Sequence, residues 1–178
     1  WHFGLWRFLY KVERVPLVVI HPGEISLVVA NDGASLPSER LLCRKVECDH
    51  FQDAGAFLLK GGERGRQLDM LTAGTYRINP ALFQVITRRN AAQHGVDPRR
   101  LLVTTVSTET VGVVTTQDGR TIAGGDLAGP MVHGHESFQK PHSFIQNGGC
   151  RGLQEEVLLA GSWNINPWFA EVEAIPMT

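Results

Sequence analysis

The stretch FLLKGGERGRQLDMLTAGTYRINP at residues 57–80 decides the fold, because it returns as FIQNGGCRGLQEEVLLAGSWNINP at residues 144–167. A shift of 87 positions superimposes the two copies without a gap, and the register reaches back to Phe51 and Phe138. Of the 30 positions from 51 to 80, 14 are identical in the second copy. Glycines and an Asn-Pro pair that stay in step over this length indicate a tandem duplication.

The recurring residues form a structural signature in each copy. In the first copy these residues are Gly61, Gly62, Arg64, Gly65, Gln67, Gly74, Asn79 and Pro80. In the second copy they are Gly148, Gly149, Arg151, Gly152, Gln154, Gly161, Asn166 and Pro167. Tyr76 and Trp163 are equivalent aromatic residues, which we predict to pack in the two cores.

Length and composition indicate a globular chain of two small units. The 178 residues allow two units of roughly 80 residues, each large enough for a modest core. The chain is 43% hydrophobic and 20% charged, which is ordinary for a globular protein. No apolar run approaches the ~18 residues of a membrane span. The three cysteines do not occupy equivalent places in the copies, which argues against a disulfide framework.

We expect four segments along the chain. Residues 1–16 form an opening segment, 17–90 the first unit, 91–102 a linker and 103–178 the second unit. The opening WHFGLWRFLYK mixes aromatic and basic residues, which suits a membrane–water interface and equally an element packed on the body. Because the chain starts on Trp1 without a signal-peptide pattern, we expect a piece of a longer protein.

The expected fold class is α+β, with a mixed or antiparallel sheet and one short helix in each unit. The β-branched runs on either side of Pro22-Gly23 predict a hairpin, and the same pattern returns at residues 101–119. Apolar residues from Phe51 to Leu58 recur at helical spacing, and the Gly-Gly pair that follows predicts a helix C-cap. Pro141 predicts that the second helix begins near Gln139 or Lys140.

Further short strands are expected on both sides of the signature bend. Residues 67–71 and 76–78 read as two strands around a turn, and we expect Gly74 and Gly161 to have φ > 0 in that turn. Asn79-Pro80 ends the second of these strands, because the residue before proline avoids the helical region. Strands then resume after each Asn-Pro pair.

The net charge of −1 conceals an asymmetry between the two halves. Residues 1–100 carry a formal charge of +4 and residues 101–178 carry −5. One interpretation is drift on solvated surfaces, and the other is a module with a basic and an acidic end that favours head-to-tail contacts. Basic residues are not interleaved with aromatic residues beyond the opening segment, so we expect no nucleic-acid partner.

The sequence predicts no catalytic, cofactor-binding or metal site. GGERG and GGCRG lack the Walker lysine, and they follow a helix whose C-terminal end disfavours anions, so a C-cap is the favoured interpretation. Cys48 and His135 are equivalent in the repeat and, with His50 and His133, could offer four ligands to Zn²⁺, but no recognised ligand spacing supports such a site. Arg64, Arg151, Gln67 and Gln154 either bond carbonyl groups of the bend or pair between the copies.

The order of these motifs resembles the start of SPFH (band 7) domains, the superfamily of stomatins, prohibitins and flotillins. The matching segments are Ile25-Ser26-Leu27-Val28 with Leu71-x-x-Gly74-x-Tyr76-x-Ile78-Asn79-Pro80, and Val111-Gly112-Val113-Val114 with Leu158-x-x-Gly161-x-Trp163-x-Ile165-Asn166-Pro167. The likeness is greatest to long bacterial flotillin-like proteins, in which such units precede the main SPFH domain. It covers nearly the whole chain after residue 12.

This resemblance implies a non-enzymatic, membrane-associated scaffold that organises microdomains or large oligomers. It implies self-association through the full-length parent, lipid contact through segments outside or at the start of this chain, and a place at the cytoplasmic face of the membrane. The chain departs from the family in having no span, no heptad helix and two copies of the leading part of the domain. The alternative hypothesis is a ligand-binding or enzymatic tandem β module, which a deep polar pocket with clustered titratable groups would favour.

Overall fold

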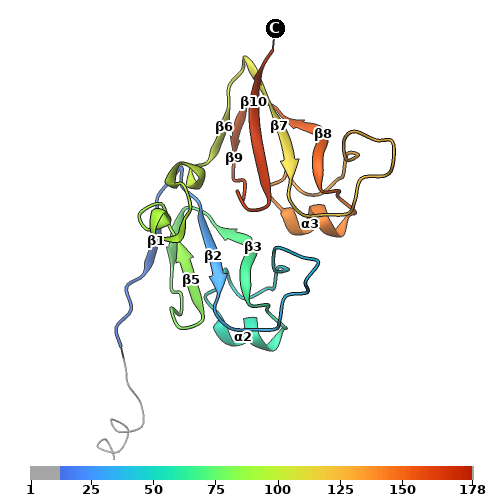
Figure 1. Cartoon of the computed structure of the whole chain (residues 1–178). Helices are drawn as coiled ribbons and strands as arrows, with labels where there is room; N and C mark the ends of the chain where they lie inside the picture. Colours follow the sequence, from blue (N-terminus) through green and yellow to red (C-terminus); the bar gives the residue numbers. More distant parts are fainter. Residues whose placement is uncertain (1–12, 178) are drawn as a thin grey trace, which may run out of the picture.

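The computed structural model describes residues 13–177, which form two similar units stacked in the same orientation (Figure 1). Residues 1–12, which include most of the predicted opening segment, lie outside this range. The elements of the first unit are β1 (Val18–Ile20), β2 (Ser26–Ala30), α2 (Ala54–Leu59), β3 (Gly65–Leu71), β4 (Gly74–Tyr76) and β5 (Phe83–Ile86).

The second unit repeats this order after a linker of two short 3₁₀ helices, η1 (Ala91–His94) and η2 (Pro98–Leu101). Its elements are β6 (Thr104–Val106), β7 (Thr110–Thr116), α3 (Pro141–Gln146), β8 (Gly152–Leu158), β9 (Gly161–Trp163) and β10 (Ala170–Pro176). Each element therefore has an equivalent 86 or 87 positions away. None of the helices among residues 13–177 has the length and apolar character needed to cross a bilayer.

Each unit contains a three-stranded and a two-stranded antiparallel sheet. The order is β3-β2-β5 with β1-β4 in the first unit, and β10-β7-β8 with β6-β9 in the second. The α+β class with antiparallel sheets is confirmed.

The predicted hairpin at Pro22-Gly23 is wrong, because β1 and β2 do not pair with each other. Instead β1 pairs with β4, with Ile20 opposite Gly74, and β2 pairs with β3, with Ser26 opposite Leu71.

The helices are shorter than the apolar spacing predicts. Helix α2 begins only at Ala54, because Asp49, His50 and Phe51 form a left-handed turn with φ values of 51°, 52° and 64°. Residues 136–138 repeat this turn, with φ values of 49°, 54° and 64°. Left-handed backbone costs roughly 1–2 kcal/mol per non-glycine residue. The core offsets this cost, since the turn buries Phe51 and Phe138, the last residue of each turn.

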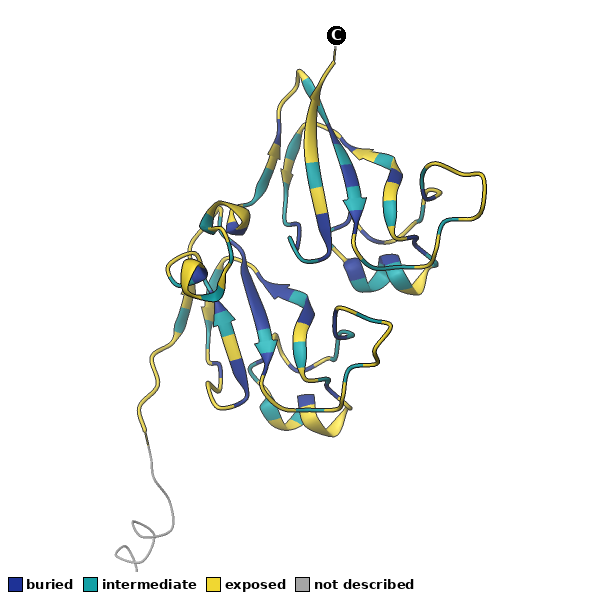
Figure 2. Ribbon diagram, viewed as in Figure 1, coloured by how far each residue is buried: buried dark blue, intermediate teal, exposed yellow. Residues whose placement is uncertain are grey.

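Each unit has an aromatic core between its sheets and its helix. In the first unit the rings of Phe51, Phe57 and Phe83 meet with centroids 4.9–6.5 Å apart. In the second unit Phe138 and Phe144 take the places of Phe51 and Phe57. The third ring is Phe169, which stands at the position of Leu82, and Phe144 lies 5.5 Å from each of the other two rings. Figure 2 shows strand β2 largely buried, whereas β10 is mostly exposed.

The predicted positive φ is wrong for Gly74, which lies in strand β4 and is not among the glycines with φ > 0. For its equivalent Gly161 the prediction is confirmed, with φ +157°. The reason for glycine is the aromatic ring two residues later: a Cβ on Gly74 would lie 3.0 Å from the Tyr76 hydroxyl, and one on Gly161 would lie 3.2 Å from the Trp163 ring. Both rings are half-buried at the edge of their cores rather than inside them.

Candidate functional site: the signature loops and the seam

The Gly-Gly pairs end the helices as predicted. Gly61 has φ +79°, and the N–H of Gly62 donates to the carbonyl of Phe57 over 2.8 Å. Gly148 and Gly149 repeat this geometry at the end of α3. The motif satisfies helix carbonyl groups that would otherwise lack a donor. These glycines are therefore caps, and their loop places no phosphate-binding N–H groups at a helix N-terminus.

The two repeated glutamines hold the loop that follows each cap. Buried Gln67 donates through Nε2 to the carbonyls of Glu63 and Gly65, at 2.8 and 2.9 Å. Gln154 makes the equivalent bonds to Cys150 and Gly152, both at 2.8 Å. Each glutamine thus bonds carbonyl groups near its own loop and does not pair with the other copy.

The repeated arginines have a different place. Arg64 and Arg151 have exposed side chains, and their backbone N–H groups donate to Ala34 and Arg120. Among the described residues neither guanidinium group has a hydrogen-bond or salt-bridge partner. These side chains therefore neither bond the carbonyl groups of the bend nor pair between the two copies.

The two units meet at a seam, which we define as the contact of β3 and residues 42–47 with α3 and residues 165–171. Leu42 and Leu68 of the first unit are buried in the core of the second unit, alongside Phe144 and Ile165. The guanidinium carbon of Arg66 lies 5.1 Å from the centre of the Trp168 ring. Side chains of one unit therefore complete the core of the other.

A hydrogen bond from Asn166 crosses the centre of the seam. Its side chain is fully buried, and its Nδ2 donates to the carbonyl of Leu68 over 2.9 Å. Its Oδ1 accepts the N–H of Trp168, which fixes the turn after Ile165. Asn79 makes the same local turn with Ala81 but is exposed. The signature asparagine therefore fixes a local turn in both units. Only Asn166, which faces the other unit, also makes a bond across the seam.

Charged pairs line the periphery of the seam. Arg44 bonds Asp118 over 3.4 Å, and Arg100 bonds Glu171 over 2.9 Å. Lys45 pairs with Asp69 over 3.1 Å beside a cavity of about 190 Å³ that reaches His142. Burial, together with Lys45 and Arg44, lowers the pKa of His142. Because a lowered histidine pKa favours the neutral ring in the folded state, stability should fall as the pH drops below about 6.5.

The four metal-ligand candidates are not brought together. His135 is buried, its Nδ1 accepts the N–H of Phe138 over 2.8 Å, and its Nε2 lies 3.2 Å from Glu156, so both ring nitrogens are occupied. Cys48 takes the same place in the first unit, accepting from the N–H of Phe51, and burial raises the pKa of its thiol. His50 and His133 are exposed. Within residues 13–177 no group of three or more His, Cys, Asp or Glu could hold a metal ion.

The sequence did not reveal the residues that make the seam. Leu42, Leu68 and Trp168 differ from their equivalents in the other copy, so a search for repeated residues passes over them. The mismatches between the copies could have indicated these residues. Leu68 stands where the second copy has Glu155, and Trp168 stands where the first copy has Ala81. Buried contacts that only one copy makes leave such mismatches in a duplicated sequence.

No family model, no curated protein and no solved structure matches this chain.

Asn166 and Asn79 form a matched pair for testing the seam. Asn166→Ala removes the bonds to the Leu68 and Gln67 carbonyls as well as the local turn, whereas Asn79→Ala removes only the turn. We expect Asn166→Ala to lower the free energy of unfolding by about 1–3 kcal/mol more than Asn79→Ala, because buried carbonyl groups lose their donor. Urea unfolding of both variants measures the difference. Equal losses would mean that the bond across the seam contributes nothing.

Proposed function

We propose that this chain is a non-enzymatic structural module of a membrane-associated scaffold of the SPFH (band 7) type, similar to long bacterial flotillin-like proteins. Such a scaffold organises membrane microdomains or large oligomeric assemblies. The order of the repeated motifs from Ile25 to Pro80 and from Val111 to Pro167 supports this assignment.

The observation that carries the proposal is what the repeated residues do. Gly62 and Gly149 cap helices, Gln67 and Gln154 hold loops, and Asn166 locks the two units together. The signature is therefore devoted to shape and to a fixed spacing between units, which a scaffold requires. The partners that we propose are further copies of the parent protein and membrane lipids.

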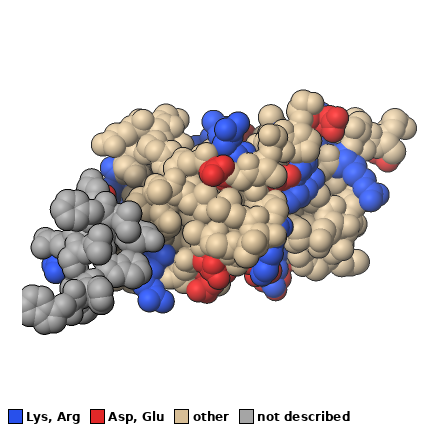
Figure 3. Space-filling model, turned by 90° about the horizontal axis from the view of Figure 1, so that it is seen from below, with Lys and Arg blue, Asp and Glu red and all other residues tan. Residues whose placement is uncertain are grey.

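The surface of the first unit opposite the seam is in keeping with contacts between modules. Figure 3 views this end and shows a mostly uncharged surface over which charged residues of both signs are scattered. Leu59 on α2 is 90% exposed there, and Leu58 is 46% exposed. In the second unit the equivalent end, with α3, contacts the first unit. A mostly uncharged end with exposed leucines suits a contact with another protein surface.

Vesicle flotation tests the membrane part of the proposal. We expect the 178-residue chain to float with vesicles of equimolar phosphatidylcholine and phosphatidylserine, because aromatic rings and basic side chains favour an anionic interface. A variant with Trp1→Ser, Phe3→Ser and Trp6→Ser should remain in the lower fraction. If the unsubstituted 178-residue chain also remains in the lower fraction, lipid contact through the opening segment is contradicted.

Sedimentation velocity tests the assembly part. Exposed ion pairs contribute only about 0–1 kcal/mol each, so the chain alone should be monomeric or weakly dimeric, and salt should weaken the association. Fusion to a trimeric coiled coil should produce larger assemblies, because the fusion raises the effective concentration. A tight oligomer that salt does not affect would show that apolar surface drives association. A fusion that remains a single trimer would contradict the scaffold proposal.

A further inference from the structure

A hollow of about 510 Å³ lies where the seam meets the linker. Strands of the first sheet, the linker and the turn after Ile165 each supply part of its wall. We call it the seam hollow and define it by the side chains of Arg66, Gln84, His94, Arg100 and Trp168. Because these residues come from both units and the linker, neither unit forms the hollow alone. Its volume is in the range that holds small ligands.

The polar side chains of the seam hollow have few partners within the protein. Among the described residues, no hydrogen-bond or salt-bridge partner exists for the side chains of Arg66, Gln84 and His94. The indole N–H of Trp168 has none in residues 13–177 either. The guanidinium group of Arg66 lies against the Trp168 ring, and this contact leaves its N–H groups unbonded. These groups are therefore available to a ligand.

Hydrogen-bond donors outnumber acceptors on the wall of the hollow. A guanidinium group offers five N–H donors and no acceptor, and an indole offers one donor. Asp97 is the one acidic residue among the described residues that line the hollow. Its carboxylate already accepts from the backbone N–H and the guanidinium group of Arg99. The hollow therefore suits a ligand that supplies acceptors.

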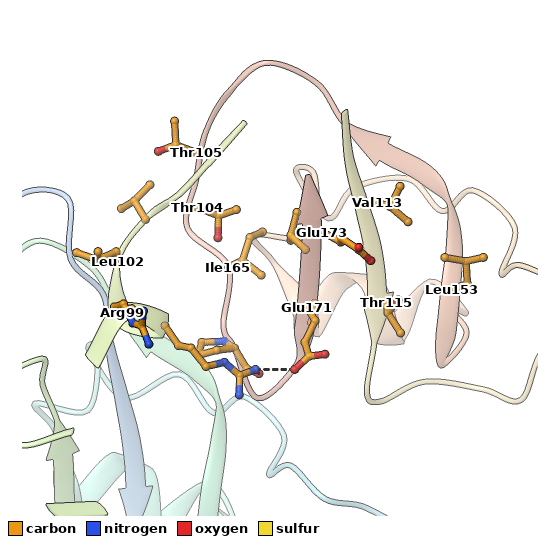
Figure 4. A pocket seen from close by; sticks show the side chains of 15 residues that line it. Arg99, Leu102, Thr104, Thr105, Val113, Thr115, Leu153, Ile165, Glu171 and Glu173 are labelled. Atoms are coloured by element: carbon orange, nitrogen blue, oxygen red, sulfur yellow. Dashed lines mark hydrogen bonds and ion pairs between the residues drawn. The ribbon is translucent and has the colours of Figure 1, made fainter. Parts of the chain in front are cut away.

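The charge of Arg66 is not compensated within the described part of the chain. Arg100, at the edge of the hollow, donates through Nη2 to the carbonyl of Pro167 and to Glu171, each over 2.9 Å. Figure 4 draws the bond to Glu171 as a dashed line. Asp97 and Glu171 are thus each matched by another arginine. An anion that enters the hollow would meet the free guanidinium group of Arg66.

The repeat shows that the fold of a unit does not require these side chains. Leu153 stands at the position of Arg66, and Ala81 stands at the position of Trp168. Strand β8 forms with the leucine in this place. Arg66 and Trp168 are therefore particular to the seam, where the guanidinium carbon lies 5.1 Å from the centre of the ring. An arginine held on one side by an aromatic ring is preorganised to bind an anion.

We propose that the seam hollow binds a small anion whose carboxylate or phosphate oxygens accept two hydrogen bonds from Arg66. The planar fork of a guanidinium group matches both kinds of anion. Trp168 and Gln84 supply further donors from the second and the first unit. Because the ligand contacts both units, its binding stabilises their stacked arrangement. The proposal goes beyond a scaffold function and does not depend on lipid binding or on assembly of the parent protein.

NMR titration of the isotope-labelled 178-residue chain with citrate and, separately, with pyrophosphate tests the proposal. Sodium chloride keeps the ionic strength constant, so that general screening does not change during the titration. We expect saturable shifts of the side-chain N–H signals of Arg66 and Trp168. Shifts with citrate alone assign a carboxylate ligand, shifts with pyrophosphate alone assign a phosphate ligand, and shifts with both confirm the shared chemistry. Absence of saturable shifts with both probes would overturn the proposal.

Two leucine variants separate the site from general charge attraction. Arg66→Leu, which makes this position the same as in the second copy, should weaken binding by about tenfold or more, because charge-assisted hydrogen bonds are lost. Arg64→Leu is the matched control, since it removes the same charge from an exposed arginine that does not line the hollow. It should change the affinity by no more than about twofold. Equal weakening by both substitutions would refute the site.

Arg66→Lys tests the fork itself and guards against a loss of folding in the leucine variant. Lysine keeps the positive charge at this position but cannot donate two parallel hydrogen bonds to one anion. We expect several-fold weaker binding of the same probe, with backbone amide signals at the parent positions. Unchanged affinity would contradict recognition through the guanidinium fork.

Discussion

Leu68→Glu is expected to separate the two units and to lower the free energy of unfolding by about 3–5 kcal/mol. Leu68 is fully buried, and its side chain belongs to the core of the second unit although it lies on strand β3 of the first. The substitution removes this apolar contact and places a carboxylate among Phe144, Phe169 and Ile165. The carboxylate can reach water only if the seam opens.

Calorimetry distinguishes the separated from the joined state. The parent chain should unfold in one transition, because each unit contributes to the core of the other, whereas Leu68→Glu should give two. The matched control is Glu155→Leu, which makes the converse change at the equivalent exposed position. Its free energy of unfolding should change by no more than about 0.5 kcal/mol. A single transition at the parent temperature for Leu68→Glu would contradict the assigned seam.

Gly33→Ala should be nearly as damaging, at about 3 kcal/mol or more, because it meets two obstacles at once. Gly33 has φ +135°, a conformation that residues with a Cβ rarely adopt. A Cβ at this position would lie 2.3 Å from the carbonyl oxygen of Gly62. This oxygen is fixed, since it accepts the N–H of Ala34 over 2.8 Å. Relief of the clash therefore requires movement of the backbone of a helix cap.

Gly23→Ala is the control for Gly33→Ala, since Gly23 also has positive φ (+82°) but no atom lies within 4 Å of its added Cβ. It should lower the free energy of unfolding by only about 1–2 kcal/mol, through backbone strain alone. Urea unfolding of both variants isolates the contribution of the clash. If the two losses are equal, the contact between the Asp-Gly turn and the Gly-Gly cap is not tight.

The sequence predicted those features that depend on neighbouring residues. The duplication and the Gly61 cap could be predicted, and so could a start of α3 near Lys140, which is its N-cap, because each follows from local sequence. The α+β class followed from the β-branched runs and from the apolar residues at helical spacing. By contrast, the pairing of β2 with β5 brings together Val28 and Val85, which are far apart along the chain. Nothing local to either residue specifies that partner.

The remaining features depend on what lies against a residue in space. Asn79 and Asn166 sit in the same sequence context, yet one is exposed and the other is fully buried at the seam. Phe51 fits a helical stripe but lies in a left-handed turn, because burial of its ring outweighs the local preference. Gly74 avoids a side chain because of the Tyr76 ring rather than its own φ. Tertiary contacts decide each of these cases.

The seam also sets an order of events during synthesis. Asn166 bonds the carbonyl of Leu68, a residue made 98 positions earlier. At roughly 5–20 residues per second, a ribosome needs about 5–20 s to add that length of chain. During that time the first unit can fold, but the core of the second unit that buries Leu42 and Leu68 does not yet exist. These two side chains are therefore exposed and accessible to chaperones. The nascent chain should therefore be most prone to aggregation after the linker has emerged and before Phe169 does.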